Sequence, residues 1–189
     1  MTADARDGIA RKSLDELDAP LREFLKPTVD RLGYLGEFFH VAANVPNAIP
    51  AFMQYTGAVK APLSDKQNEV LALTVCALLE ADYERIQHER LSKRLGFSLE
   101  WIAAAASMPG SHPSALADDE RLLQALAVAV VTRHGMRCAD EVRAVAAALG
   151  QDKAVAALLQ VSRFVTIALL CNSLSLSLPV PSVFDEPQT

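Results

Sequence analysis

Apolar residues recur every three or four positions along most of the chain, which is the period of a helix with one buried face. The stripe is clearest in residues 64–78, 118–135 and 152–176. Strict alternation of apolar and polar residues, the signature of a strand, occurs only in the short segment SLSLSLP. The pattern therefore predicts an all-α protein, with about seven or eight helices.

Capping residues predict where two of these helices begin. Ser13 with Glu16, and Ser64 with Gln67, have the spacing of capping boxes. Because proline removes a backbone donor and crowds the preceding turn, Pro20 and Pro27 are expected to limit the length of the first helix.

The helical pattern divides one domain into four consecutive segments. We predict N-terminal helices in residues 1–63, a core that carries the candidate chemistry in 64–107, a C-terminal helical half in 108–178 and a tail in 179–189. The segments LSDKQNEVLAL and LADDERLLQAL share an acid-then-apolar rhythm. They indicate either two pseudo-repeated halves or a likeness of composition between Ala/Leu-rich helices.

Charge and composition exclude several classes of partner. Eighteen Lys and Arg against 23 Asp and Glu give a net charge of −5, and no basic run interleaves with aromatic residues, so we expect no nucleic-acid partner. Residues 164–184 hold no charge but contain Asn172, four serines, Pro179 and Pro181, which predicts a buried helix and a tail rather than a membrane span. The acidic N-terminus MTADARDG does not resemble a secretory signal, so a cytoplasmic location is expected.

The cysteines indicate neither a disulfide framework nor a zinc site. Cys76, Cys138 and Cys171 are odd in number and lack the spacing of metal ligands, and small buried residues are the simplest interpretation. The sequence also has no glycine-rich phosphate loop and no HExxH motif. We therefore expect neither a cofactor nor a metal.

Candidate chemistry is concentrated in residues 83–88. Glu84 and His88 are four residues apart and so would be neighbours on one helix face, where a carboxylate can orient an imidazole for general acid or base catalysis. Tyr83 adds a phenolic donor, and Arg85 could bind a substrate carboxylate through a bidentate contact.

Residues 63–104 resemble the core of the carboxymuconolactone decarboxylase and AhpD-like alkylhydroperoxidase superfamily. The redox members of that family have Glu, eleven residues and then CxxCxxxH; here Glu69 precedes Ala81, Glu84 and His88 at the same spacing. The resemblance implies an AhpD-like multi-helix bundle, a homo-oligomer, and a site of His88, Glu84, Glu69 and Tyr83. Because both redox cysteines are replaced, by Ala81 and Glu84, disulfide chemistry at these positions is disfavoured.

The resemblance makes a geometric demand. In one straight helix, Glu69 and His88 would lie about 28 Å apart, because each residue adds about 1.5 Å. The helix must therefore break near Leu79 to Asp82, with Asp82 as a suitable N-cap for the next helix.

These observations favour acid–base chemistry, either decarboxylation or proton transfer, on a small organic acid or carbonyl compound. In this hypothesis His88 moves the proton, Glu84 orients it, and Glu69 and Tyr83 complete the hydrogen-bonding shell. Two alternatives stay open: a non-catalytic oligomeric binding or scaffold protein, and residual hydroperoxide reduction through Cys76.

Overall fold

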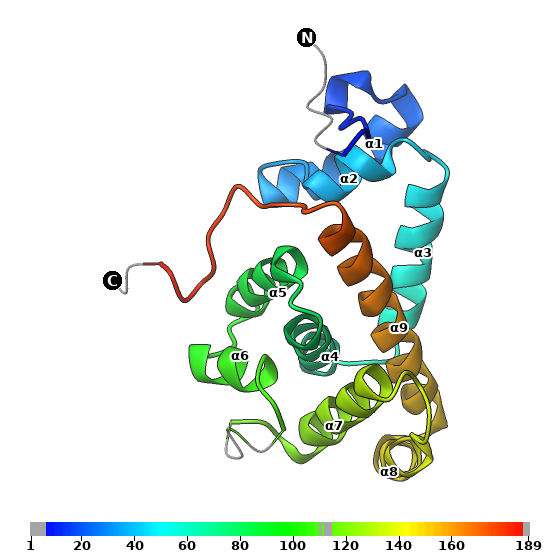
Figure 1. The fold of residues 1–189 in the computed structure, drawn as a ribbon, viewed down its shortest axis with the longest axis vertical. Helices are drawn as coiled ribbons and strands as arrows, with labels where there is room; N and C mark the ends of the chain where they lie inside the picture. Colours follow the sequence, from blue (N-terminus) through cyan, green and yellow to red (C-terminus); the bar gives the residue numbers. More distant parts are fainter. Residues whose placement is uncertain (1–6, 110, 112–114, 187–189) are drawn as a thin grey trace.

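The computed structural model describes residues 7–109, 111 and 115–186, and all regular secondary structure in this part of the chain is helical, as predicted (Figure 1). Nine α-helices and one 3₁₀ turn are present there, and no strand. This number is above the seven or eight helices expected, because it includes the short helix α2, which has only six residues. The elements are η1 (Leu14–Glu16), α1 (Ala19–Leu32), α2 (Glu37–Ala42), α3 (Ala48–Lys60), α4 (Asp65–Leu78), α5 (Asp82–Arg94), α6 (Leu99–Ala105), α7 (Asp118–Thr132), α8 (Ala139–Leu149) and α9 (Gln151–Ser173).

Helix α4 is the centre of the fold. It packs against α5, α6, α7 and α9, which surround it in Figure 1, and every residue from 67 to 76 is buried. Its polar side chains consequently need partners inside the protein. The Asn68 amide donates hydrogen bonds to three backbone carbonyls, and the Thr74 hydroxyl donates to the Ala105 carbonyl at 3.0 Å.

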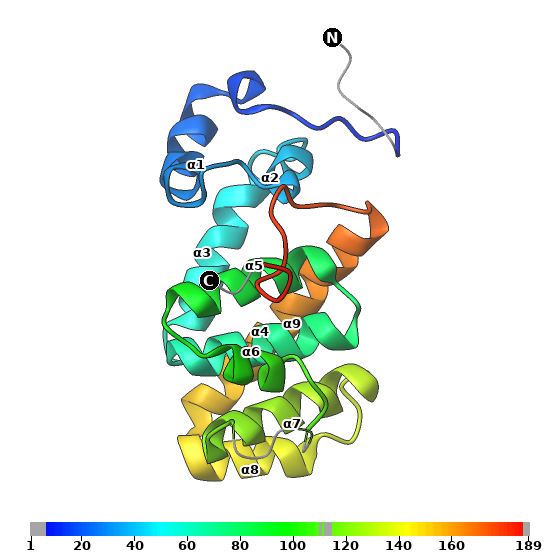
Figure 2. The ribbon, with the colours of Figure 1, turned by 90° about the vertical axis from the view of Figure 1, so that its left-hand side faces the viewer.

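Helix α9 is long and apolar enough to cross a membrane, but it is a core helix of this fold. Of its most apolar window, 56% is buried inside the protein. It packs against α3, α4, α7 and α8, and Figure 2 shows it running from the level of α8 towards the N-terminal helices. A buried core helix meets the same length and composition criteria as a membrane span.

The N-terminal segment differs from the prediction. The capping box at Ser13 and Glu16 closes only the 3₁₀ turn η1. Helix α1 begins at Ala19, and its N-cap is Asp18, whose side chain accepts a hydrogen bond from the Leu21 N–H at 2.9 Å. Pro20 lies in the first turn, where no N–H is needed. Pro27 lies inside α1 without ending it. The helix continues because Leu21 and Leu25 pack in a small core with Leu17, Ala43 and Ile49.

The chain breaks between α4 and α5, at the place that the resemblance required. Glu80 adopts a left-handed conformation with φ 51°, and the Ala81 N–H donates to the Cys76 carbonyl at 2.9 Å. The expected N-cap was wrong: Ala81 precedes the helix, and Asp82 is its first residue. Ala81 is fully buried against Cys76 and Ala168, so a hydrated carboxylate would not fit there.

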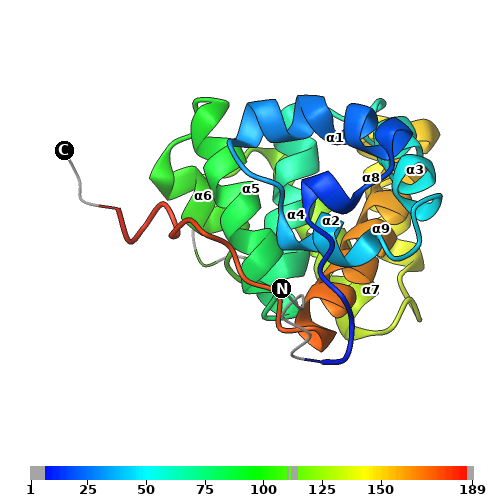
Figure 3. The same cartoon turned by 90° about the horizontal axis from the view of Figure 1, so that it is seen from above.

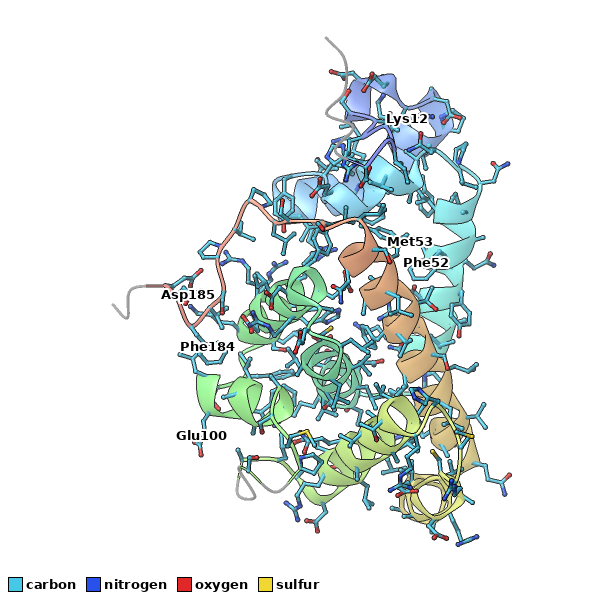
Figure 4. The ribbon with its side chains drawn as sticks, viewed as in Figure 1. Lys12, Phe52, Met53, Glu100, Phe184 and Asp185 are labelled. Atoms are coloured by element: carbon cyan, nitrogen blue, oxygen red, sulfur yellow. The ribbon has the colours of Figure 1, made fainter. Side chains whose placement is uncertain are left out.

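The segment after α9 returns along α5, as Figure 3 shows. The Ser182 hydroxyl donates to Glu89 at 2.6 Å, and Glu186 forms ion pairs with Arg90 and Lys93. Figure 4 shows Phe184 and Asp185 on this segment, at the side of α5 and α6. The predicted tail is thus bound to the fold up to Glu186, and its last three residues lie outside the described part of the chain.

Candidate active site

The break between α4 and α5 brings Glu69 and His88 into direct contact, although they are 19 residues apart. His88 Nδ1 lies 2.7 Å from Glu69 Oε2, and the Ser92 hydroxyl lies 3.5 Å from the same oxygen. Only 2% of Glu69 is exposed. A carboxylate in the middle of a buried helix requires such hydrogen-bonding partners.

Glu84 flanks the imidazole on its other side. Its Oε2 lies 3.7 Å from His88 Nε2, as expected for side chains four residues apart on one helix. The imidazole also packs edge-on against the ring of Phe164, with centroids 5.0 Å apart. His88 is therefore held between two carboxylates and an aromatic ring from three helices.

The two carboxylates determine the charge of His88. Burial by itself would lower the pKa of His88, but the charges and hydrogen bonds of Glu69 and Glu84 outweigh it and raise the pKa to about 9. The imidazole is consequently protonated at neutral pH, and both ring nitrogens carry a hydrogen. In this state His88 can act as a proton donor or stabilise a developing negative charge.

His88 and Glu84 line a cavity of about 180 Å³. This volume is below the range of about 300–1,000 Å³ that is typical of drug-sized ligands, so the cavity suits a small molecule. Phe52 and Met53 of α3, labelled in Figure 4, supply part of its apolar lining. The other lining residues come from α1, α2, α3, α5 and α9: Thr28, Arg31, Leu32, Phe38, Phe39, Thr56, Gln87, Leu91, Arg94, Arg163 and Ile167.

Tyr83 lies outside the lining of this cavity. It is buried, and its hydroxyl accepts a hydrogen bond from the Phe38 N–H at 3.2 Å. A Cβ on Gly36 would lie 2.6 Å from this hydroxyl, so the absent side chain leaves it space. Burial raises the pKa of Tyr83, which keeps the phenol protonated. In the structure Tyr83 anchors the start of α2.

The predicted substrate-binding arginine also lies elsewhere. Arg85 forms ion pairs with Asp82, at 2.8 Å, and with the buried Glu89, and it is not among the residues that line the cavity. Arg31, Arg94 and Arg163 line it instead. Sequence reasoning missed Arg163, although a signal was present: it is the single charged residue between Lys153 and Asp185.

No cysteine is among the lining residues of this cavity. Cys76 is fully buried against Ala81, and burial raises its pKa well above the usual value, which favours the thiol over the thiolate. Cys171 is also buried, and its pKa is raised for the same main reason. Within residues 7–109, 111 and 115–186, no three His, Cys, Asp or Glu side chains are arranged to hold a metal ion.

Comparison with known proteins identifies the fold. No family model and no curated protein sequence matches the chain. A solved structure described as an alkylhydroperoxidase AhpD core, an uncharacterized peroxidase-related protein from Ralstonia eutropha JMP134, matches with a TM-score of 0.76 and 15% identity, over 86% of this chain and 87% of that one. An uncharacterized peroxidase-related protein from Silicibacter sp. TM1040 matches with a TM-score of 0.76 and 11% identity, over 91% and 90% of the two chains. The chain thus has the all-helical AhpD-like fold. This agrees with the sequence resemblance of its Glu69–His88 segment to AhpD-like proteins.

Proposed function

We propose that this protein is an acid–base enzyme that acts without redox chemistry on a small organic acid or a related carbonyl compound. The observation that carries the proposal is the position of His88, which is held by Glu69 and Glu84 at the wall of a small cavity. A fixed histidine that is oriented by carboxylates and lines a small cavity is the arrangement that general acid catalysis requires.

In a decarboxylation, the bond between the carboxyl carbon and its neighbour breaks and carbon dioxide leaves. A conjugated carbonyl in the substrate accepts the electron pair as an enolate, and His88 then gives its proton to the carbon that lost the carboxyl group. Glu69 stabilises the imidazolium before this transfer and holds the ring in place. Solvent returns the proton to His88 and completes the cycle.

The location of the cysteines also supports chemistry that does not depend on a thiol. The two structural neighbours are described as peroxidase-related, so hydroperoxide is the natural comparison substrate. Reduction through Cys76 would require access to a fully buried thiol whose pKa is raised by burial.

The test compares His88→Gln with His40→Gln on a panel of small keto acids and unsaturated lactone acids. Carbon dioxide release and proton–deuterium exchange are measured for each substrate, and consumption of hydroperoxide is measured alongside. His40 is the matched control, because its ring bonds the carbonyls of Lys12 and Leu35 and does not line the cavity. We expect His88→Gln to lower kcat about 10²- to 10⁴-fold and His40→Gln to leave it within a few-fold.

Three outcomes would contradict the proposal: full activity of folded His88→Gln, no turnover of any acid or carbonyl substrate by the wild type, or hydroperoxide consumption that disappears in Cys76→Ser. The second result would favour the scaffold interpretation, and the third would favour a thiol peroxidase.

A further inference from the structure

Arg163 is a buried cation with an incomplete set of partners. Only 7% of it is exposed, yet it lines the cavity that contains His88. Within the described part of the chain its side chain makes one hydrogen bond, from Nε to Gln160 Oε1 at 2.7 Å, and no ion pair. The two terminal nitrogens of the guanidinium, which carry four of its five hydrogens, are left for another acceptor.

A buried polar chain fixes the position of this guanidinium. Asn68 is held by backbone carbonyls near the start of α4, and its Oδ1 accepts a hydrogen bond from Gln160 Nε2 at 2.6 Å. Gln160 in turn accepts from Arg163 Nε. The guanidinium also lies over the ring of Phe164, with its carbon 3.9 Å from the centroid. Nε therefore orients the side chain, and the terminal fork, formed by the two terminal nitrogens, is not used for this purpose.

The charges around Arg163 leave room for an anion. Glu69 and Glu84 act on it electrostatically, but neither forms an ion pair with it, and burial lowers its pKa overall. The two negative charges of Glu69 and Glu84 are balanced by the positive charges of His88 and Arg163. Arg31 and Arg94, which are exposed at the same cavity, add two positive charges. The terminal nitrogens of Arg163 have no hydrogen-bond acceptor within the described part of the chain, and leaving buried donors without one is costly, so a ligand that supplies an anionic acceptor is favoured here.

We infer that Arg163 binds the carboxylate of the ligand through its terminal fork, and that the ligand is a small monocarboxylate with an apolar body. The planar fork of arginine matches a carboxylate in a bidentate contact. Phe38, Phe52 and Met53 line the same cavity and offer apolar surface for the rest of the molecule. The inference deepens the proposed function, because it rests on that cavity being the active site and names what its substrate carries.

The experiment uses benzoate and its neutral isostere benzamide as probes of the full-length protein. Binding is measured by calorimetry, and the Nε–H signal of Arg163 is followed by NMR in the wild type. We expect benzoate to bind at least tenfold more tightly than benzamide, and the Arg163 signal to shift with benzoate alone. Arg163→Gln should remove this preference while benzamide binding is kept, and Arg163→Lys should retain part of it, because it keeps the charge without the fork.

Two further variants serve as comparisons. Arg143→Gln removes an exposed positive charge on α8, away from the cavity, and should bind benzoate like the wild type. Arg94→Gln tests the exposed edge of the cavity and should weaken benzoate only a few-fold, because an exposed charge is screened by solvent.

The inference is overturned if benzoate and benzamide bind equally, if Arg163→Gln keeps the preference, or if Arg94→Gln is the variant that loses it. Should both Arg163 variants fail to fold, the wild-type NMR signal still decides, since an Arg163 signal indifferent to benzoate contradicts the inference. Binding does not depend on turnover. Loss of benzoate binding with intact His88-dependent catalysis would contradict this inference alone. Intact benzoate binding without His88-dependent catalysis would contradict the proposed function alone.

Discussion

At the residue scale, the site depends on the unusual position of Glu69. Its carboxylate lies inside a helix that is buried on every side, and it reaches His88 rather than water. The energetic cost of burying this charge is offset most when His88 is protonated. Glu69 and His88 consequently act as one unit, and the charge state of the imidazole affects both the chemistry and the stability of the fold.

This coupling predicts a particular dependence of stability on pH. Folding raises the pKa of His88 from 6.5 to about 9, so the folded state binds this proton more tightly than the unfolded chain. The resulting stabilisation is fully present below pH 6.5 and is lost as the pH rises through 9. We expect the difference in unfolding free energy between wild type and His88→Gln to shrink by at most about 3 kcal/mol over this interval.

Urea denaturation of both proteins at several pH values measures this difference. Other titrating groups are common to the two chains, so their effects largely cancel in the comparison. A difference that stays constant, or grows, between pH 6.5 and 9 would show that the pKa of His88 is not raised in the folded protein.

At the scale of elements, the connection between α4 and α5 makes the contact of Glu69 and His88 possible. Its geometry requires Glu80 to adopt a left-handed conformation with φ 51°, which costs an L-residue with a Cβ about 1–2 kcal/mol. Glu80 is exposed, and neither a hydrogen bond nor an ion pair of its side chain accounts for its presence in the described part of the chain.

Glu80→Gly should therefore stabilise the protein. Glycine removes the conformational strain but loses more backbone entropy on folding, and we expect a net gain of about 0.5–1 kcal/mol. Glu80→Ala is the matched control, because it removes the same carboxylate and keeps the Cβ. Thermal unfolding of the three proteins gives the comparison. An alanine variant as stable as the glycine variant would mean that the charge, and not the backbone, determines the effect.

The elements also show what the sequence could and could not predict. The helical class followed from periodicity, and the break after α4 followed from the family resemblance, which requires Glu69 and His88 to share one site. The first helix was misplaced, because a capping box can close a single 3₁₀ turn as well as open a helix. The prediction of Asp82 as N-cap was wrong. The N-cap position is occupied by Ala81, which is fully buried, and this burial outweighs the local preference for Asp at an N-cap. Such burial depends on α9, which lies far away in the sequence.

At the scale of the whole molecule, the cavity combines α1, α2, α3, α5 and α9. Helical spacing places Glu84 beside His88, but it says nothing about which distant helix faces them. This is why Arg85, a neighbour in sequence, was predicted to bind substrate, whereas the structure places Arg163 of α9 at the cavity. The N-terminal helices, which carried no candidate residue in the sequence, supply much of the apolar lining.

The outer face of α9 is left uncovered in a single chain. Val155, Leu159 and Leu169 are 40–55% exposed, and with Ser162 and Thr166 between them they recur every three or four residues. Such a stripe is the pattern of a helix that packs against a second helix. We propose that a second copy of this chain covers the stripe.

This proposal predicts a mass above 20.4 kDa, the mass of one chain, in sedimentation or light-scattering measurements of the wild type. Leu159→Glu combined with Leu169→Glu should reduce the mass to that of one chain without loss of helical content, because two buried charges without partners oppose association. Leu95→Glu with Met108→Glu is the matched control, since both residues are exposed and lie outside α9. A single-chain mass for the wild type contradicts the proposal. An unchanged mass in the α9 variant would place any interface on another face.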